Sequence, residues 1–138
     1  LACQRAYFDE VVARVAAARP DHFPLPDPHR DSYRPPLGRF LIAWSDDLPV
    51  ACVSLRALDG TTAEVKRLWV HASARGQGLS RRMMAAIEAE ARDMGFQRLR
   101  LDTNSALTEA IALYRATGWT DIPPYTDPPG DTWMGKPL

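Results

Sequence analysis

Two glycines separated by one residue, Gly76 and Gly78, form the clearest candidate for binding chemistry in the sequence. They follow an apolar strand pattern and precede a helical one, within the loop Arg75-Gly76-Gln77-Gly78-Leu79-Ser80-Arg81. The first N–H groups of a helix have no partner inside it, and the positive end of the helix dipole attracts anions. Glycine also lacks the Cβ that would keep a phosphate from the backbone. The loop therefore predicts a pyrophosphate site, to which Arg75 and Arg81 add positive charge.

This loop differs from the two common nucleotide-binding patterns. It lacks the Lys-Ser/Thr ending of a P-loop. It also lacks the third glycine of a dinucleotide fingerprint and the acidic residue that such a site has on a following strand. The sequence therefore calls for another ligand that carries a pyrophosphate.

The elements around the loop predict one α+β domain over residues 1–138, with a mixed, mostly antiparallel sheet flanked by helices. Apolar spacing predicts helices over about 5–18, 79–94 and up to about 117, and strands over 40–44, 50–58, 62–70, 98–103, 119–122 and 132–135. A helix between the strands 62–70 and 98–103 makes one parallel crossover. A proline-rich stretch, 20–36, is predicted to be mainly loop.

Composition excludes several classes of protein. The chain has 138 residues, of which 46% are hydrophobic, and its 17 basic side chains balance 17 acidic ones. A nucleic-acid partner is therefore not expected, because such proteins usually carry a basic excess. No apolar run approaches the roughly 20 residues of a membrane span. Two cysteines without metal-binding spacing predict a cytoplasmic protein with neither a disulfide framework nor a metal.

Two spaced motifs resemble those of the GNAT superfamily of N-acetyltransferases. Arg75, Gly78 and Ser80 match its glycine signature, with Ser80 in place of the usual Gly or Ala. The segment 113–119, Leu-Tyr-Arg-Ala-Thr-Gly-Trp, is similar to its second landmark, and 100–104 is similar to the strand between them. The resemblance covers about 62–119. The superfamily's first strand is missing, because the chain starts at the first helix.

The resemblance implies a fold in which two central strands splay apart and acetyl-CoA binds between them. Backbone groups of Leu68, Trp69 and Val70 would pair with the pantetheine amides, and Asn104 and Ser105 would form the second wall. The pyrophosphate would lie on the loop residues Arg75, Gly76, Gln77, Gly78, Leu79, Ser80 and Arg81.

Two residues are candidates for the chemistry. An amine must lose a proton before it attacks a thioester, and the leaving thiolate must gain one. Glu64 lies on the strand before the loop, where alternation would place it on one face with Leu68 and Val70, and similar acetyltransferases use a Glu there as base. Tyr114 occupies the position that resembles their general acid. The structural alternatives are a surface Glu64 paired with Lys66 or Arg67, and a Tyr114 that only packs in the core.

The acceptor is expected to be a primary amine of a small molecule or peptide. A different class remains open, a non-catalytic acyl-CoA-binding module that regulates an attached N-terminal domain. An enzyme of ATP or NAD is a third possibility. Homodimerisation is compatible with the sequence. Acceptor specificity is expected in the loops 20–36 and 123–131, whose acidic residues suit a cationic amine.

Overall fold

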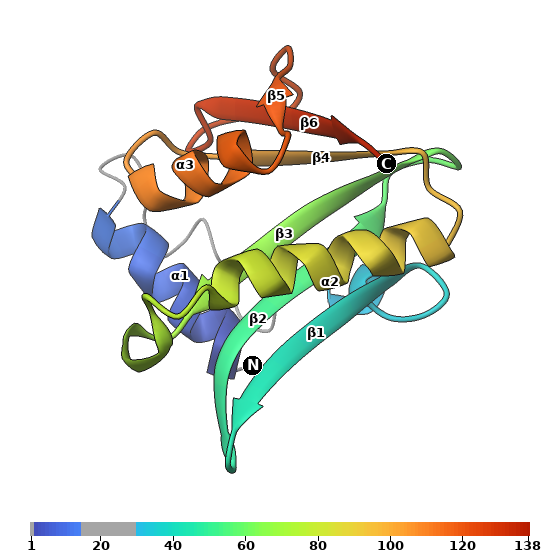
Figure 1. The fold of residues 1–138 in the computed structure, drawn as a ribbon. Coiled ribbons are helices and arrows are strands. Elements are labelled where there is room, and N and C mark those ends of the chain that lie inside the picture. The colour runs from blue at the N-terminus through green and yellow to red at the C-terminus, as the bar shows by residue number, and fades with distance from the viewer. Residues whose placement is uncertain (1, 15–29) are drawn as a thin grey trace.

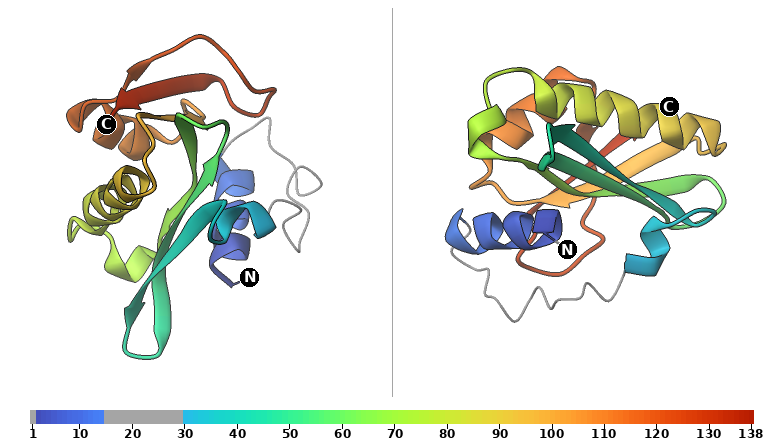
Figure 2. Two further views of the ribbon diagram at one scale, coloured as in Figure 1. Left: turned by 90° about the vertical axis from the view of Figure 1, so that its right-hand side faces the viewer. Right: turned by 90° about the horizontal axis from the view of Figure 1, so that it is seen from below.

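The computed structural model describes residues 2–14 and 30–138, which fold into a six-stranded sheet with helices on both faces (Figures 1 and 2). In chain order the elements are α1 (Ala2–Arg14), η2 (Arg30–Tyr33), β1 (Gly38–Ser45), β2 (Leu48–Ala57), β3 (Thr62–Val70), η3 (Ala72–Ala74), α2 (Leu79–Asp93), β4 (Arg98–Thr103), α3 (Thr108–Ala116), β5 (Thr120–Asp121) and β6 (Thr132–Pro137). None of the helices in these ranges is both long and apolar enough to cross a membrane.

The strand order is β1-β2-β3-β4-β6-β5, and all neighbours are antiparallel except β3 and β4. The predicted α+β class and the single parallel crossover, made by α2, are confirmed. The first helix was predicted to reach residue 18, but 15–18 lie outside the described residues. Most of the proline-rich stretch also lies outside the described residues. The structure describes its end, residues 30–36, which includes η2.

Each face of the sheet has its own apolar core. Figure 2 shows α2 and α3 on one face and α1 on the other. The helical spacing predicted for α2 is confirmed, because Met83, Ile87 and Ala91 are buried against the sheet. Under α1, Cys3 packs with Cys52 and Trp69.

A β-bulge in β3 changes which side chains share a face. The register between β2 and β3 shifts between Cys52 and Ser54, and Arg67 opposite this shift adopts a left-handed φ of 61°. Val65 and Val70 are five residues apart, yet both join the core under α2. Regular alternation would put them on opposite faces, so the bulge supplies one extra residue.

The bulge makes one prediction wrong. Glu64 was expected to share a face with Leu68 and Val70 by simple alternation. Glu64 precedes the bulge and neighbours Val65, which points into the α2 core, so Glu64 points to the opposite face. Leu68 and Val70 follow the bulge and pack against the α2 core.

The two central strands separate soon after they meet. β3 pairs with β4 only over Thr62–Glu64 and Arg98–Arg100. Beyond Arg100, β4 continues beside β6, while β3 diverges from it (Figure 1). Within the described chain, the rest of the β4-facing edge of β3 therefore carries no strand partner. This is the splayed pair of strands that the resemblance implied.

Candidate functional site

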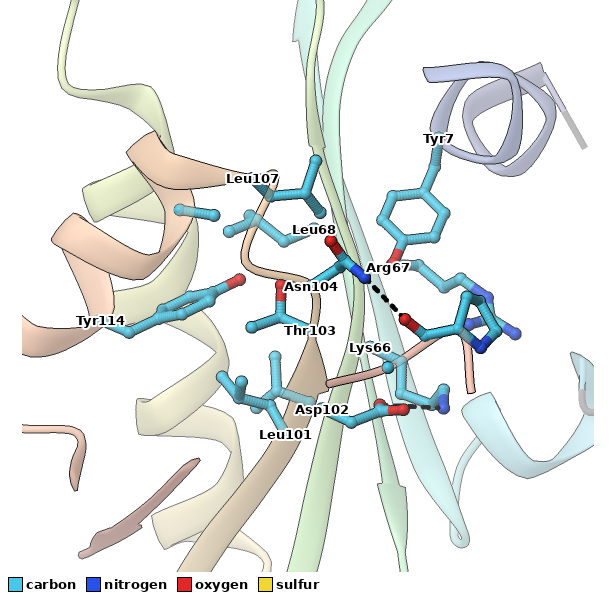
Figure 3. Close-up of a pocket in the computed structure, with 14 residues that line it drawn as sticks. Tyr7, Lys66, Arg67, Leu68, Leu101, Asp102, Thr103, Asn104, Leu107 and Tyr114 are labelled. Carbon is cyan, nitrogen blue, oxygen red and sulfur yellow. Dashed lines mark hydrogen bonds and ion pairs between the residues drawn. The ribbon is translucent and has the colours of Figure 1, made fainter. Parts of the chain in front are cut away.

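A cavity of about 130 Å³ lies in the fork between β3 and β4 (Figure 3). We call it the fork pocket. Its lining comes from both strands, from α1 and α3, and from the loop before β6. The lining residues are Tyr7, Val65, Lys66, Arg67, Leu68, Leu101, Asp102, Thr103, Asn104, Leu107, Ala110, Tyr114, Pro129 and Gly130.

A larger cavity of about 380 Å³, the loop cleft, adjoins the fork pocket. Leu68 and Ala110 line both cavities, so the two are neighbours. The structure brings together most of the predicted cofactor residues here. The lining consists of Glu10, Arg14, Leu68, Trp69, Val70, Ala74, Arg75, Gly76, Gly78, Leu79, Ser80, Arg81, Glu109, Ala110 and Leu113.

The glycine loop has the backbone that an anion site requires. Gly76 and Gly78 adopt φ angles of 76° and 71°, a region that other residues rarely enter. Gly78 is the N-cap of α2 and has no side chain to bind the first N–H groups of the helix. In the described helix α2, the first turn contains no acidic residue that would repel an anion. The loop therefore offers N–H donors and a helix N-terminus to an anion.

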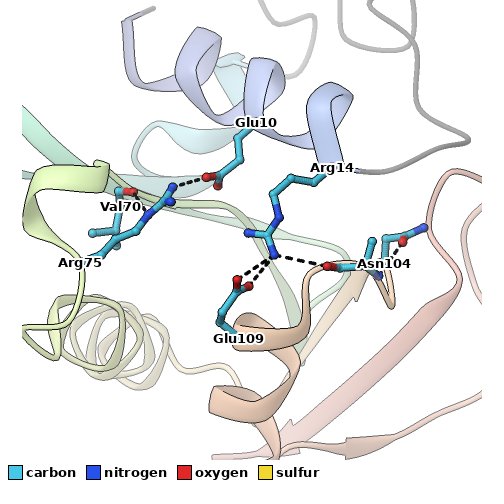
Figure 4. Close-up of polar contacts among 7 residues, drawn as sticks. Glu10, Arg14, Val70, Arg75, Asn104 and Glu109 are labelled. Carbon is cyan, nitrogen blue, oxygen red and sulfur yellow. Dashed lines mark hydrogen bonds and ion pairs between the residues drawn. The ribbon is translucent and has the colours of Figure 1, made fainter.

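Two ion pairs connect α1 to the walls of the loop cleft (Figure 4). The Arg75 guanidinium donates to Glu10 and, over 3.1 Å from Nε, to the carbonyl oxygen of Val70. Arg14 lies 2.6 Å from a carboxylate oxygen of Glu109 at the start of α3. Helix α1 thus bridges the loop on one side and α3 on the other.

Tyr114 reaches the fork pocket from α3. Its side chain is 6% exposed, its ring packs 5.9 Å from that of Trp119, and its hydroxyl end faces the interior of the pocket (Figure 3). Burial raises the pKa of Tyr114 above its ordinary value, and the nearby Tyr7 and Asp102 add to the rise. Tyr114 is therefore both a core residue and a proton-bearing group at the pocket wall.

Glu64 is completely buried at the base of the fork. One carboxylate oxygen accepts a 2.8 Å hydrogen bond from Arg56 Nε, and the other accepts one of 2.8 Å from the Tyr125 hydroxyl. Lys66 Nζ lies 3.6 Å from the first oxygen. Glu64 is not part of the lining of either cavity described above. The structural alternative from sequence was a surface Glu64 paired with Lys66 or Arg67. Glu64 is buried, so its predicted exposure is wrong, but Lys66 is one of its partners.

A second carboxylate, Asp102, does line the fork pocket. Its Oδ1 atom is 3.6 Å from Lys66 Nζ, so one ammonium group lies between Asp102 and Glu64. Its Oδ2 atom accepts a 2.9 Å hydrogen bond from Thr126. The sequence predicted only a strand over 98–103, and a local pattern could not show that this strand ends at a pocket.

The remaining predicted cofactor residues lie apart from the loop cleft. Asn104 lines the fork pocket, where its Nδ2 donates to the carbonyl oxygen of Pro129 over 2.7 Å. The Ser105 hydroxyl donates to Asp131 over 2.8 Å, and Ser105 is absent from both linings. Gln77 is also absent from them, although both flanking glycines are present.

Four functional candidates were missed by sequence reasoning. Tyr7, Arg67 and Asp102 line the fork pocket, and Tyr125 binds Glu64. Tyr7 comes from α1, and Tyr125 from a proline-rich loop 61 positions after Glu64. These segments are far apart in the sequence, and no local sequence pattern marks the bulge at Arg67 or the fork.

Sequence comparisons show which proteins this chain is similar to. The model of the "Acetyltransferase (GNAT) family" matches residues 6–119. A protein of Azospirillum brasilense named "IAA acetyltransferase" is 40% identical over 105 residues, which are 72% of this chain and 68% of that protein. The "Uncharacterized N-acetyltransferase YsnE" of Bacillus subtilis is 30% identical over 113 residues, 78% of this chain and 75% of its own.

Solved structures share the fold. A GCN5-related N-acetyltransferase from Kribbella flavida superposes with a TM-score of 0.75 at 21% identity, covering 96% of this chain and 89% of that one. A GNAT family acetyltransferase from Elizabethkingia anophelis, crystallised with acetyl-CoA bound, gives a TM-score of 0.65 at 17% identity, covering 88% and 92%. At such identities the likeness concerns the fold.

Proposed function

Because the chain belongs to the GNAT acetyltransferase family, we propose that it transfers the acetyl group of acetyl-CoA directly to a primary amine. In this proposal the pyrophosphate lies on the glycine loop and the acyl end lies in the fork pocket. The observation that carries it is that the two cavities are adjacent, with Leu68 and Ala110 in the lining of both. We propose that a ligand bound at the helix N-terminus extends past these two residues to Tyr114.

The residues of the loop cleft fit acetyl-CoA. The open N-terminus of α2 suits a pyrophosphate, and Arg75 and Arg81 line the cleft beside it. A Cβ added at Gly76 or Gly78 would meet nothing within 4 Å among the described atoms, so the loop surface is accessible. β4 has left the edge of β3 at Leu68–Val70, and this edge is proposed to provide backbone groups for the amides of pantetheine. The Val70 carbonyl oxygen accepts a hydrogen bond from Arg75 Nε in the structure. Asn104 lines the adjoining fork pocket and completes the wall on the side of β4.

Glu64 is the proposed base. An alkylamine has a pKa near 10.4, so at pH 7 only about one molecule in a few thousand is ready to attack. Glu64 is buried behind the fork pocket, so we propose that the amine proton reaches it through water. Arg56 and Tyr125 hold the carboxylate in place, and Lys66 connects it to the pocket wall.

Tyr114 is the proposed acid. As the new N–C bond forms and the C–S bond breaks, the CoA sulfur leaves with the electron pair and takes up a proton. The buried phenol of Tyr114 faces the fork pocket, and it carries its proton at neutral pH, since the ordinary pKa of tyrosine is about 10 and burial raises it. A donor that acts mainly as charge develops contributes to turnover more than to binding.

Cofactor choice can be measured by calorimetry with the purified protein. We expect acetyl-CoA and CoA to bind, and ATP and NAD to bind more weakly. Adenosine 3′,5′-bisphosphate, which lacks the pyrophosphate and pantetheine, serves as a control and should bind more weakly than CoA. Tighter binding of ATP or NAD than of CoA would overturn the cofactor assignment.

A further inference from the structure

Two tyrosine hydroxyls face the fork pocket from opposite sides of the sheet. Tyr7 belongs to α1 and Tyr114 to α3, helices that cover different faces (Figure 2). Both residues line the pocket, and the hydroxyl end of each side chain points into it (Figure 3). Because β3 and β4 part at the fork, no strand separates the two side chains. A group bound between the parted strands can therefore contact both phenols.

The direction in which the cofactor enters assigns a different atom to each tyrosine. Leu68 and Ala110 line both cavities, and Tyr114 follows Ala110 by four residues, about one turn further along α3. In the proposed binding mode, pantetheine passes Ala110 and brings the sulfur to the Tyr114 side of the fork pocket. The acetyl carbonyl comes after the sulfur, towards the side from which Tyr7 projects.

Acetyl transfer places a negative charge on the carbonyl oxygen. When the amine nitrogen bonds to the carbonyl carbon, the π electron pair moves to this oxygen. The pair returns as the C–S bond breaks, and the sulfur takes the proton of Tyr114. A hydrogen-bond donor aimed at the carbonyl oxygen stabilises the charge while it exists, and such a donor is worth a large part of the rate.

The Tyr7 hydroxyl is available as this donor. In the described parts of the chain, no hydrogen bond joins it to another residue. Other polar groups of the lining are engaged: Lys66 Nζ lies 3.6 Å from a carboxylate oxygen of Asp102, and Asn104 Nδ2 donates to the carbonyl oxygen of Pro129 over 2.7 Å. The phenol of Tyr7 can therefore donate to a ligand without breaking a contact described here.

A positive charge lies beside Tyr7. The guanidinium carbon of Arg67 is 5.8 Å from the centre of the Tyr7 ring. Burial raises the pKa of the Tyr7 phenol, and the Arg67 charge opposes that rise. The phenol keeps its proton at neutral pH, because the ordinary pKa of tyrosine is about 10. The nearby cation also favours negative charge on an oxygen that the phenol binds.

We propose that Tyr7 is a catalytic residue that donates a hydrogen bond to the acetyl carbonyl oxygen, while Tyr114 serves the sulfur. This inference rests on the proposed acetyl transfer and adds to it the side chain that stabilises the oxyanion. Thr103 also lines the fork pocket and carries a hydroxyl. Tyr7 is the better donor of the two, because a phenol is more acidic than an alcohol and Arg67 lies over its ring.

The carbonyl contact can be measured without turnover. Acetyl-CoA with an isotope label at the carbonyl carbon is bound to the protein, and infrared difference spectroscopy gives the stretching frequency of its C=O bond. A donor weakens this bond, so we expect a lower frequency in the wild-type complex than for acetyl-CoA in water. A frequency equal to or above that in water would overturn the inference before any variant is made.

Tyr7→Phe assigns the contact to one hydroxyl. It keeps the ring that packs 5.6 Å from Phe8, so we expect a folded protein in which the carbonyl frequency rises. Thr103→Val and Tyr114→Phe should leave the frequency unchanged, because the first removes the rival hydroxyl and the second the partner of the sulfur. A shift in either of these variants, without one in Tyr7→Phe, would contradict the assignment.

Turnover gives an independent readout. We expect Tyr7→Phe to lower kcat about 10²-fold, with acetyl-CoA affinity and the KM of the amine little changed, because the donor acts mainly on transition-state charge. Tyr33→Phe is the matched control: its ring centre is 6.0 Å from the Arg67 guanidinium carbon, but Tyr33 does not line the pocket, so kcat should stay normal.

Two results would count against different claims. A normal kcat in folded Tyr7→Phe, or a raised KM of the amine as its only effect, would reject the oxyanion role and leave acetyl transfer intact. Failure of the wild-type protein to bind acetyl-CoA, or to acetylate any amine, would instead reject the proposed function itself.

Discussion

The Tyr125 hydroxyl donates a 2.8 Å hydrogen bond to Glu64, across 61 positions of sequence. The contact joins the loop before β6 to the base of the fork, where β3 and β4 part. It leaves Glu64 with a partner on each oxygen, since Arg56 binds the other one. The proposed base is therefore fixed in one orientation, which general base catalysis requires.

Glu64→Gln removes the negative charge and keeps the shape. We expect turnover at neutral pH to fall roughly 10²-fold or more, because the amine proton then lacks its acceptor. The loss should shrink at high pH, where the amine deprotonates unaided. The measurement is kcat against pH, with acetyl-CoA affinity and melting temperature as controls. Full activity at pH 7 would leave Glu64 with a structural role only.

Tyr114→Phe tests the proposed acid. The ring and its packing against Trp119 remain, so we expect the melting temperature to change little. Turnover should fall while acetyl-CoA still binds, because the hydroxyl acts mainly in the transition state. Measuring kcat and acetyl-CoA affinity on the same preparation separates the two effects. A large loss of stability with a normal kcat would withdraw the acid role.

The raised pKa of Tyr114 predicts an effect of pH on stability. A group whose pKa is higher in the folded state stabilises the fold below its unfolded pKa, near 10 for tyrosine. That contribution is lost as pH rises from about 10 toward the folded pKa. We expect the wild-type melting temperature to fall more steeply above pH 10 than that of Tyr114→Phe. If the melting temperatures of the two proteins fell in parallel above pH 10, the raised pKa of Tyr114 would be contradicted.

Gly78→Val tests the glycine loop. Because Gly78 has a φ of 71°, any side chain there strains the backbone by about 1–2 kcal/mol, and a β-branched one by more. The added group would also project into the loop surface, which is open in the structure. We expect much weaker acetyl-CoA binding by calorimetry. Gly60→Val, in open space at a turn without a positive φ, is the matched control and should bind normally. Normal affinity in a folded Gly78→Val would reject the pyrophosphate assignment.

The sequence predicted the elements well because each rests on a local pattern. Strand β3 has the predicted bounds, and α2 begins at Leu79 as expected and ends one residue before the predicted Met94. Gly95 follows with a φ of 88°, as a residue after a helix end often does. The position of the glycine loop between a strand and a helix could likewise be predicted, since the glycines, the strand and the helix are adjacent in the chain.

The candidate site could be predicted only in part, because its other contacts join segments that are far apart in the sequence. The face of Glu64 was predicted from strict alternation, which the bulge at Arg67 interrupts. Nothing local marks that bulge, since arginine is an unusual residue for a positive φ. The sequence predicts only a strand at Asp102, because the fork that exposes this residue depends on where the pairing with β3 stops.

Acetyl transfer itself is measured most directly by following thiol release from acetyl-CoA and identifying the acetylated product by mass spectrometry, over a panel of primary amines. Tertiary amines of similar size and charge provide the control. The account predicts one N-acetyl product per thiol released with at least one primary amine, and none with the tertiary amines. Tight binding of acetyl-CoA without turnover on any primary amine would contradict it and indicate a non-catalytic acyl-CoA-binding module.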